Sequence, residues 1–210
     1  MTITFPVDLL ADWPGWSPRF ELMRRQEQSR TTGGKTIVKD FGSPLWAGSW
    51  VSRTLSPNEL DHWRARLDAL EEGLQTFRGY ALSRCYPIAY PQAAYEALGI
   101  GAVTVSALGG NNKSCRVTGL SAGYQVSIGD MIAIAGSGLH RVMEAVTADN
   151  GGVSPYFELR PHFAPGAAVG AAVQLVRPSC LMQVVPGSIT ADADPQTGRG
   201  TISFDGMEVL

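Results

Sequence analysis

The segment 56–80 (SPNELDHWRARLDALEEGLQTFRGY) constrains the fold most, because it predicts a capped amphipathic helix that leads directly into a strand. Ser56 suits the N-cap, Pro57 suits the first helical position, and Glu59 is spaced to complete a capping box. The apolar positions that follow recur every three or four residues, which places them on one helical face. These positions are Leu60, Trp63, Leu67 and Leu70. We therefore expect one apolar face of this helix to pack on the core.

The end of this helix and the residues after it also carry a pattern. Gly73 is placed to end the helix in a left-handed conformation, after which Leu74 can fold back onto the apolar face. Residues 75–82 then alternate as a strand. Nearly everything else suits short strands joined by turns, in keeping with 24 glycines and 13 prolines. The sequence therefore predicts a mainly β fold with one prominent α-helix.

The composition changes near residue 100, which indicates a second unit. Residues 100–178 contain few charged side chains and are rich in Gly, Ala and Val, in short strand-like runs separated by turn signals. Such runs favour a small closed β-barrel. The segment 201–210 alternates as a strand, and a strand at a chain end is normally held in a sheet. We therefore expect a discontinuous first domain, residues 1–96 and 179–210, with the barrel (97–178) inserted in it.

Two tryptophans mark the expected strand 45–55. Trp46 and Trp50 are an even number of residues apart, so both side chains face the same side of a regular strand. Gly48 lies between them in that row and indicates a bulge or a close approach by another group.

Composition and charge exclude several classes of protein. The formal net charge of −2 provides no global basic field for nucleic acid or an acidic membrane surface. No apolar run approaches the roughly 18 residues of a membrane span, and the first residues lack the features of a signal peptide. The three cysteines include no CxxC pair, so we expect buried thiols in a reducing compartment. These features predict synthesis in a cytoplasm and no membrane insertion.

A basic segment followed by a glycine-hinged loop is the candidate subunit interface. The segment 20–30 is polar and is expected to be extended or weakly helical, and the loop after it (TTGGK) lacks the glycine spacing of a Walker motif. A solvated face and a subunit contact are both compatible with this pattern. The interface residues we select are Arg24, Arg25, Arg30, Gly33, Gly34 and Lys35.

The residues 119–123 (GLSAG) formally match the nucleophile elbow G-x-S-x-G. That motif requires a helix after the turn, whereas residues 124–128 have a strand pattern, so we expect a glycine-rich hairpin. His140 could act as a base toward Ser121, although nothing in their spacing requires it. The histidines are not spaced as metal ligands. We therefore expect no enzyme activity, no metal site and no cofactor.

The order of these elements resembles that of the distal tail proteins of long-tailed (siphovirus-like) bacteriophages and related tail-like particles. The resemblance rests on the strand pair TIVKDFG and PLWAGSWVSRTL, the helix SPNELDHWRARLDALEEG, the strand QTFRGYAL and the closing GTISFDGMEVL. It covers most of the chain as an order of elements, through soft patterns rather than an invariant signature. It implies a tail-tube-like β-sandwich ring domain with an inserted barrel of the oligonucleotide/oligosaccharide-binding (OB) type.

The resemblance also implies a function and a set of partners. Such a protein is a structural component of the virion: it forms a hexameric ring at the tail tip, joining the tail tube to the hub, baseplate or tip fibre. It is assembled in the host cytoplasm, and DNA passes through the ring without specific binding. Two alternatives remain open. The barrel could bind a host glycan through Tyr124, Tyr156, Phe157 or Phe163, or the chain could be a serine hydrolase using Ser121 and His140.

Overall fold

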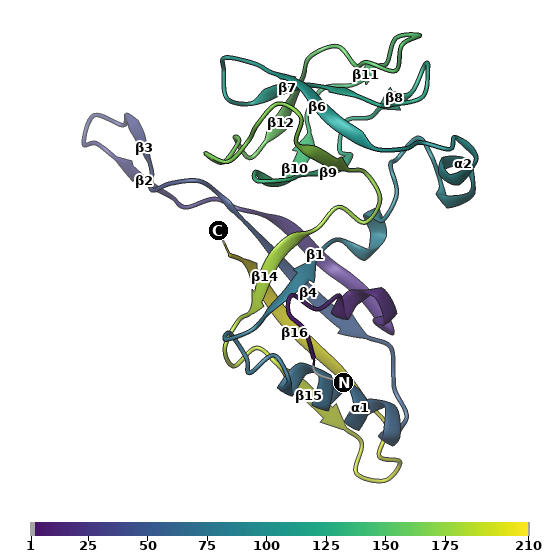
Figure 1. Ribbon diagram of the computed structural model, residues 1–210. Helices are drawn as coiled ribbons and strands as arrows, with labels where there is room; N and C mark the ends of the chain where they lie inside the picture. Colours follow the sequence, from purple (N-terminus) through teal and green to yellow (C-terminus); the bar gives the residue numbers. More distant parts are fainter. Residues whose placement is uncertain (1–2, 210) are drawn as a thin grey trace.

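The computed structural model describes residues 3–209, which form mainly β-strands arranged as an open sheet and a closed barrel (Figure 1). Few residues are helical, and the expected mainly β fold with a closed barrel is confirmed. The sheet has the order β1 (Gly15–Met23), β4 (Leu45–Ser52), β16 (Gly200–Glu208), β14 (Cys180–Val184) and β5 (Thr76–Gly79), with β15 (Thr190–Ala193) also paired to β16.

The closed barrel is made of six strands. In order around it they are β10 (Gly138–Val142), β12 (Phe157–Arg160), β7 (Ser114–Thr118), β6 (Val103–Leu108), β13 (Ala172–Gln174) and β9 (Met131–Ile134). Two smaller pairs are β2 (Gln26–Arg30) with β3 (Thr36–Asp40), and β8 (Gln125–Val126) with β11 (Val146–Thr147). The helices are α1 (Pro57–Asp68), α2 (Gln92–Ala97) and the short 3₁₀ helices η1 (Leu9–Asp12) and η2 (Leu82–Arg84).

The pairing of the strands shows how the chain runs between the two units. The barrel strands all lie between Val103 and Gln174, and the chain returns to the sheet at β14. The last strand, β16, lies in the middle of the sheet, with β4 on one side and β14 and β15 on the other. A β-sandwich requires two facing sheets, whereas these strands form one sheet with α1 packed beside β15 and β16. The sandwich is therefore not confirmed.

The start of α1 follows the predicted capping pattern. Both the backbone N–H and the hydroxyl of Ser56 donate to the Glu59 carboxylate at 2.9 Å. The Ser56 backbone bond is the main cause that lowers the pKa of Glu59 to about 2. The predicted apolar face is confirmed as core, because its members are buried. They are Leu60, Trp63, Leu67 and Leu70.

The end of α1 differs from the prediction. Gly73 does not have a positive φ; Glu71 and Glu72 take that conformation instead, at 49° and 55°. Leu74 is 74% exposed and does not fold back onto the helix. The chain turns earlier because Leu70 remains in the core while its carbonyl accepts the Gln75 N–H at 3.0 Å, just before β5. The need for the chain to enter β5 thus outweighs the preference for glycine at a left-handed helix end.

The predicted close approach at Gly48 is confirmed. Trp46 and Trp50 are fully buried, and the Phe20 ring contacts both of them. A Cβ on Gly48 would come within 2.5 Å of Trp50 and 2.9 Å of Phe20. Gly206, directly opposite Gly48 on β16, would come within 2.9 Å of Trp50 in the same way. The two glycines leave room for the Trp50 ring against the sheet.

The barrel and the sheet share a core rather than being joined only by linkers. Met131, Ala133 and Leu139 of the barrel belong to the same buried cluster as the tryptophans of the sheet. The Trp46 indole N–H donates to the Leu139 carbonyl at 2.7 Å. The barrel therefore covers part of the sheet, and its position is determined by packing and by a buried hydrogen bond.

Candidate subunit interface

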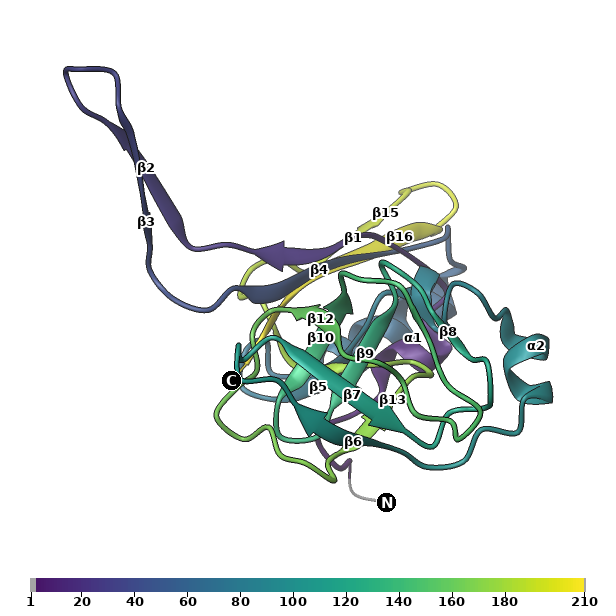
Figure 2. The ribbon, with the colours of Figure 1, turned by 90° about the horizontal axis from the view of Figure 1, so that it is seen from above.

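The connection between β1 and β4 forms a hairpin that projects from the body of the molecule (Figure 2). We call residues 24–44 the arm. Its strands β2 and β3 pair in register from Gln26 opposite Asp40 to Arg30 opposite Thr36. Every residue of both strands is exposed. The segment 20–30 is therefore extended, and it belongs partly to the sheet (β1) and partly to the arm.

The structure brings the six selected interface residues into this one hairpin. Arg24 and Arg25 lie at its base and Arg30 ends β2, while the remaining three form its tip. In the tip, the Thr31 N–H donates to the Lys35 carbonyl at 2.9 Å, and Gly34 has a φ of 79°. The glycine is needed there because L side chains rarely adopt this conformation. Contact of these residues with another subunit stays a prediction.

The arm also carries apolar side chains that the sequence prediction missed. Ile37, Val38 and Phe41 are 49%, 56% and 47% exposed. Ile37 and Phe41 share one face of the hairpin and Val38 lies on the other, since side chains alternate along a strand. An isolated two-stranded hairpin is marginally stable, and exposed apolar side chains favour docking. The three apolar residues of TIVKDF, within an otherwise polar segment, were the available signal in the sequence.

The charge of the arm differs from that of the whole chain. Residues 24–44 contain five basic and two acidic side chains, whereas the chain has a net charge of −2. The arm stands away from the body of the molecule (Figure 2), and its five basic side chains are exposed. A docking surface for the arm should therefore combine acidic groups with apolar contacts.

Strand β1, from which the arm begins, is an edge of the sheet. Within residues 3–209, β1 pairs only with β4, and its other side has no strand partner. Pro18 and an irregularity in register between Trp16 and Arg19 interrupt this edge. Such features limit uncontrolled pairing of an open edge with other chains. The β1 edge leads directly into the arm, and η2 and Arg141 contact part of this edge at Ser17 and Phe20.

The serine of the G-x-S-x-G motif has no catalytic surroundings. The motif turns between β7 and β8, and a strand follows it, as the sequence predicts. Gly119 and Gly123 have positive φ values of 92° and 71°. The Ser121 hydroxyl donates to the Leu98 carbonyl at 3.4 Å. This is a turn built on glycines, without the helix that a nucleophile elbow requires.

His140 is bonded to groups other than Ser121. It is fully buried in β10, and its Nε2 lies 2.9 Å from the Ser137 hydroxyl, while its Nδ1 lies 3.0 Å from the Pro161 carbonyl. Since a carbonyl only accepts, Nδ1 carries the proton and Nε2 accepts from Ser137. Both ring nitrogens are used in holding the β9–β10 turn against residue 161. Burial lowers the pKa of His140 to about 4.

This buried histidine predicts a loss of stability in mild acid. The folded-state pKa of about 4 lies below the ordinary value of 6.5, so between these values only the unfolded chain binds the proton. The free energy of unfolding therefore decreases as the pH falls through that range, by about 2 kcal/mol between pH 7 and pH 5. Asp130 and Glu208 act in the opposite direction, because burial raises their pKa values.

Comparison with His140→Gln isolates the contribution of His140 to the pH dependence of the free energy of unfolding. Urea denaturation of both proteins at pH 7 and pH 5 is expected to show the larger loss in the wild type, by about 2 kcal/mol. Equal changes in the two proteins would contradict the assignment of a neutral, buried His140.

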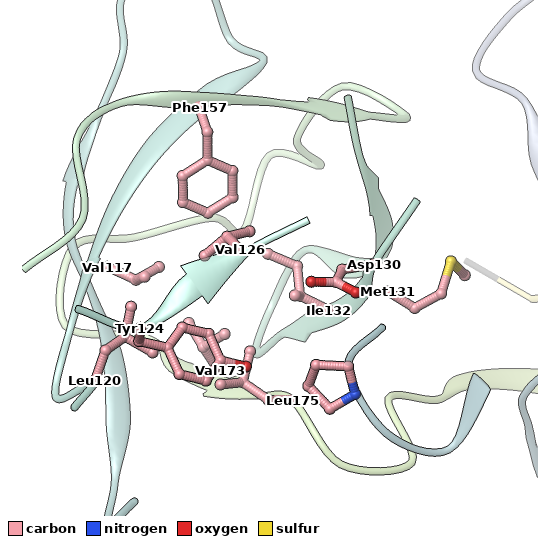
Figure 3. A pocket seen from close by; sticks show the side chains of 11 residues that line it. Val117, Leu120, Tyr124, Val126, Asp130, Met131, Ile132, Phe157, Val173 and Leu175 are labelled. Atoms are coloured by element: carbon pink, nitrogen blue, oxygen red, sulfur yellow. The ribbon is translucent and has the colours of Figure 1, made fainter. Parts of the chain in front are cut away.

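The interior of the barrel is filled by its own side chains (Figure 3). The free volume inside is about 10 Å³, close to the space of a single water. In this view Phe157 points into the cluster that contains Val126 and Tyr124, and the Asp130 carboxylate lies beside Ile132. Asp130 accepts the Ile88 N–H at 2.7 Å and the Ser127 N–H at 2.8 Å. The side chains that line this cavity therefore form a packed core with room for about one water.

An open groove of about 990 Å³ lies between the barrel and the sheet. Its walls are mostly apolar and include Ile134, Ala172 and Leu181. Among its polar lining residues, Ser137 is bonded to His140, and the Glu208 carboxylate accepts the Trp46 N–H at 3.0 Å, so these two take part in holding the fold. Arg78, Gln174 and Ser179 also line the groove.

The aromatic side chains considered for glycan binding are mostly core. Tyr124, Phe157 and Phe163 are buried, and Tyr90 stacks on Tyr124 with ring centres 4.7 Å apart. Tyr156 is exposed, with the Arg116 guanidinium 5.7 Å from its ring. One exposed ring does not make the aromatic platform expected of a sugar site.

The described part of the chain has no cluster of three or more metal-ligating side chains. None of the helices within residues 3–209 is long and apolar enough to cross a membrane. Comparison of the sequence with protein-family models and with curated proteins gives no match.

Proposed function

We propose that this chain is a structural subunit of a phage tail tip, forming a hexameric ring that joins the tail tube to the hub, baseplate or tip fibre. The order of elements resembles that of distal tail proteins, and the observation that carries the proposal is the exposed arm. A hairpin whose strand residues are all exposed and belong to neither core gains stability by docking on a neighbour. Head-to-tail contacts between identical subunits close into a ring when the rotation permits.

In this proposal the two units have different roles. The sheet with α1 is the tail-tube-like ring domain, and the barrel is an insertion of the OB type that faces the next component of the tail. The β1 edge, which leads directly into the arm, supports a role of the sheet in assembly. The tail tube protein and a hub or fibre protein are the proposed partners. The site of action is the virion, after assembly in the host cytoplasm.

The low overall charge agrees with a ring through which DNA passes. A net charge of −2 gives no general attraction for phosphates, and tight binding would hinder passage. The basic groups of the arm are consistent with this role if they are covered by the neighbouring subunit.

The alternatives receive less support. For a hydrolase, the pairing of His140 with Ser137 and Pro161 leaves Ser121 without a base. For a glycan-binding module, most of the barrel aromatics are buried. We therefore propose a role without enzyme activity, and the bonding of His140 and Ser121 supports this proposal beside the resemblance in fold.

Negative-stain imaging tests the proposed function. The purified chain, alone and mixed with the tail tube or hub protein of the same genome, is expected to form closed rings with sixfold symmetry. Ring subunits of this kind can require a partner to assemble, so both conditions are needed. A chain that stays monomeric with every tail protein of its own particle would overturn the proposal.

A further inference from the structure

A cleft of about 430 Å³ opens beside the β1 edge, away from the arm tip. Three parts of the chain meet there: β1, the segment 81–88 that connects the sheet to the barrel, and the barrel near residues 128–141. Its volume lies within the roughly 300–1,000 Å³ of small-ligand sites. Two arginines, Arg84 and Arg141, line it, and we call it the arginine cleft.

The guanidinium of Arg141 is held in place by the core. It lies 5.1 Å from the ring centre of Trp46, which is fully buried. One of its nitrogens donates to the Phe20 carbonyl at 3.5 Å, a long contact. Arg141 is half-buried, so its planar group is oriented before any ligand arrives. Such preorganisation reduces the entropy lost on binding.

Within the described residues neither arginine forms a salt bridge, although Asp130 lies near Arg84 and Glu21 lies near Arg141. Glu21 pairs with Arg19 at 3.6 Å. Arg84 donates to the Ser83 carbonyl at 3.1 Å. Each guanidinium has five N–H donors, so most remain free to bind an acceptor. Burial and then the charge of Arg84 lower the pKa of Arg141, against the effect of Glu21.

Apolar side chains surround these charges. Ile88 and Ile128 are 47% and 63% exposed at the cleft, and Phe20 and Met131 contribute to its walls. Gly129, at the rim of the cleft, has a φ of 91°, a conformation that L side chains rarely adopt. Two exposed isoleucines beside two unpaired arginines match a ligand with an anionic head and an apolar body.

We propose that the arginine cleft binds a carboxylate or phosphate group attached to an apolar moiety. The anion lies between Arg84 and Arg141 and accepts paired N–H bonds from their guanidinium groups. The apolar part packs against Ile88 and Ile128. The same chemistry is offered by a free organic anion and by an acidic side chain beside an aromatic one on a partner protein. The binding test uses the purified chain by itself, so its outcome is separate from that of the ring-assembly test.

Calorimetric titration of the purified full chain tests this site with three probes. Phenyl phosphate represents a free organic anion, and N-acetyl-Phe-Glu-amide represents an acidic side chain of a partner. Inorganic phosphate lacks the apolar part. We expect saturable binding of phenyl phosphate or the dipeptide, tighter than that of inorganic phosphate. The tighter of the two identifies the source of the anion.

Variants assign the binding to the two arginines. Arg84→Gln and Arg141→Gln are each expected to weaken binding about tenfold or more, as loss of charge-assisted hydrogen bonds does. Arg141→Lys keeps the charge but loses the planar group, and an intermediate loss is expected. Arg199→Gln, which removes an equal charge from an exposed loop, is the matched control and should have no effect.

Two results would overturn the proposal. One is the absence of saturable binding with all three probes. The other is binding that Arg84→Gln leaves unchanged. Arg84 is exposed, so its substitution is informative even where a change at Arg141 disturbs the packing on Trp46.

Discussion

Replacing Trp50 with alanine is expected to lower the free energy of unfolding by about 3–5 kcal/mol, the range for a large aromatic residue removed from a core. Trp50 is fully buried, and its ring contacts those of Phe20, Phe77 and Phe204. Gly48 and Gly206 face the same ring, so neither supplies a side chain to fill the space. The surrounding side chains can therefore collapse into the cavity only to a limited extent. The loss of free energy of unfolding should lie toward the upper end of the range of about 3–5 kcal/mol.

Trp16→Ala provides the matched control. Trp16 is on β1, in the same sheet, but it is 53% exposed. Its removal should change the free energy of unfolding by about 0.5 kcal/mol or less. Urea denaturation followed by circular dichroism measures both variants with the same probe. Similar midpoints for Trp50→Ala and the wild type would show that the aromatic cluster is not the centre of the core.

Removing the arm is expected to abolish ring assembly while leaving the fold intact. Met23 and Leu45 lie directly opposite each other where β1 and β4 pair, so residues 24–44 can be replaced by a two-residue Asn-Gly turn. Every residue of the two arm strands is exposed, and none belongs to either core cluster. The shortened chain should therefore keep its midpoint of thermal unfolding. Light scattering and negative-stain images, with the partner proteins present, measure assembly.

A substitution variant separates the apolar contacts of the arm from its length. Changing Ile37, Val38 and Phe41 together to serine removes the exposed apolar groups and keeps the hairpin. Leu74→Ser with Val169→Ser removes exposed apolar groups elsewhere and serves as the control. Assembly should fail in the first variant and persist in the second. Rings formed by the shortened, folded chain would show that the arm is not the subunit contact.

Features set by neighbouring residues were predictable from the sequence. The start of α1 depends on Ser56 and Glu59, three residues apart, and the structure has the bonds between them. The apolar face of α1 follows from a helical period, and the close approach at Gly48 follows from strand alternation. The strand pattern after Ser121 likewise excludes a nucleophile elbow through local sequence alone. These patterns depend on interactions between residues a few positions apart, so the local sequence is enough to predict them.

Features that depend on distant contacts were decided by the tertiary structure. The left-handed turn lies at Glu71 and Glu72 rather than at Gly73, because Leu70 stays in the core as the chain enters β5. His140 bonds to Ser137 and Pro161 because the barrel brings those residues together.

The arm and the arginine cleft also combine features that local sequence predicts with features that only tertiary contacts decide. The basic segment marked the arm in the sequence, but the pairing of β2 with β3 set its shape and left its apolar side chains exposed. Nothing local connects Arg84 with Arg141, which share a cleft only because the barrel packs on the sheet. Local propensity determines where elements begin and which face is apolar. Burial and hydrogen bonding between elements far apart in the sequence decide which side chains lie next to one another.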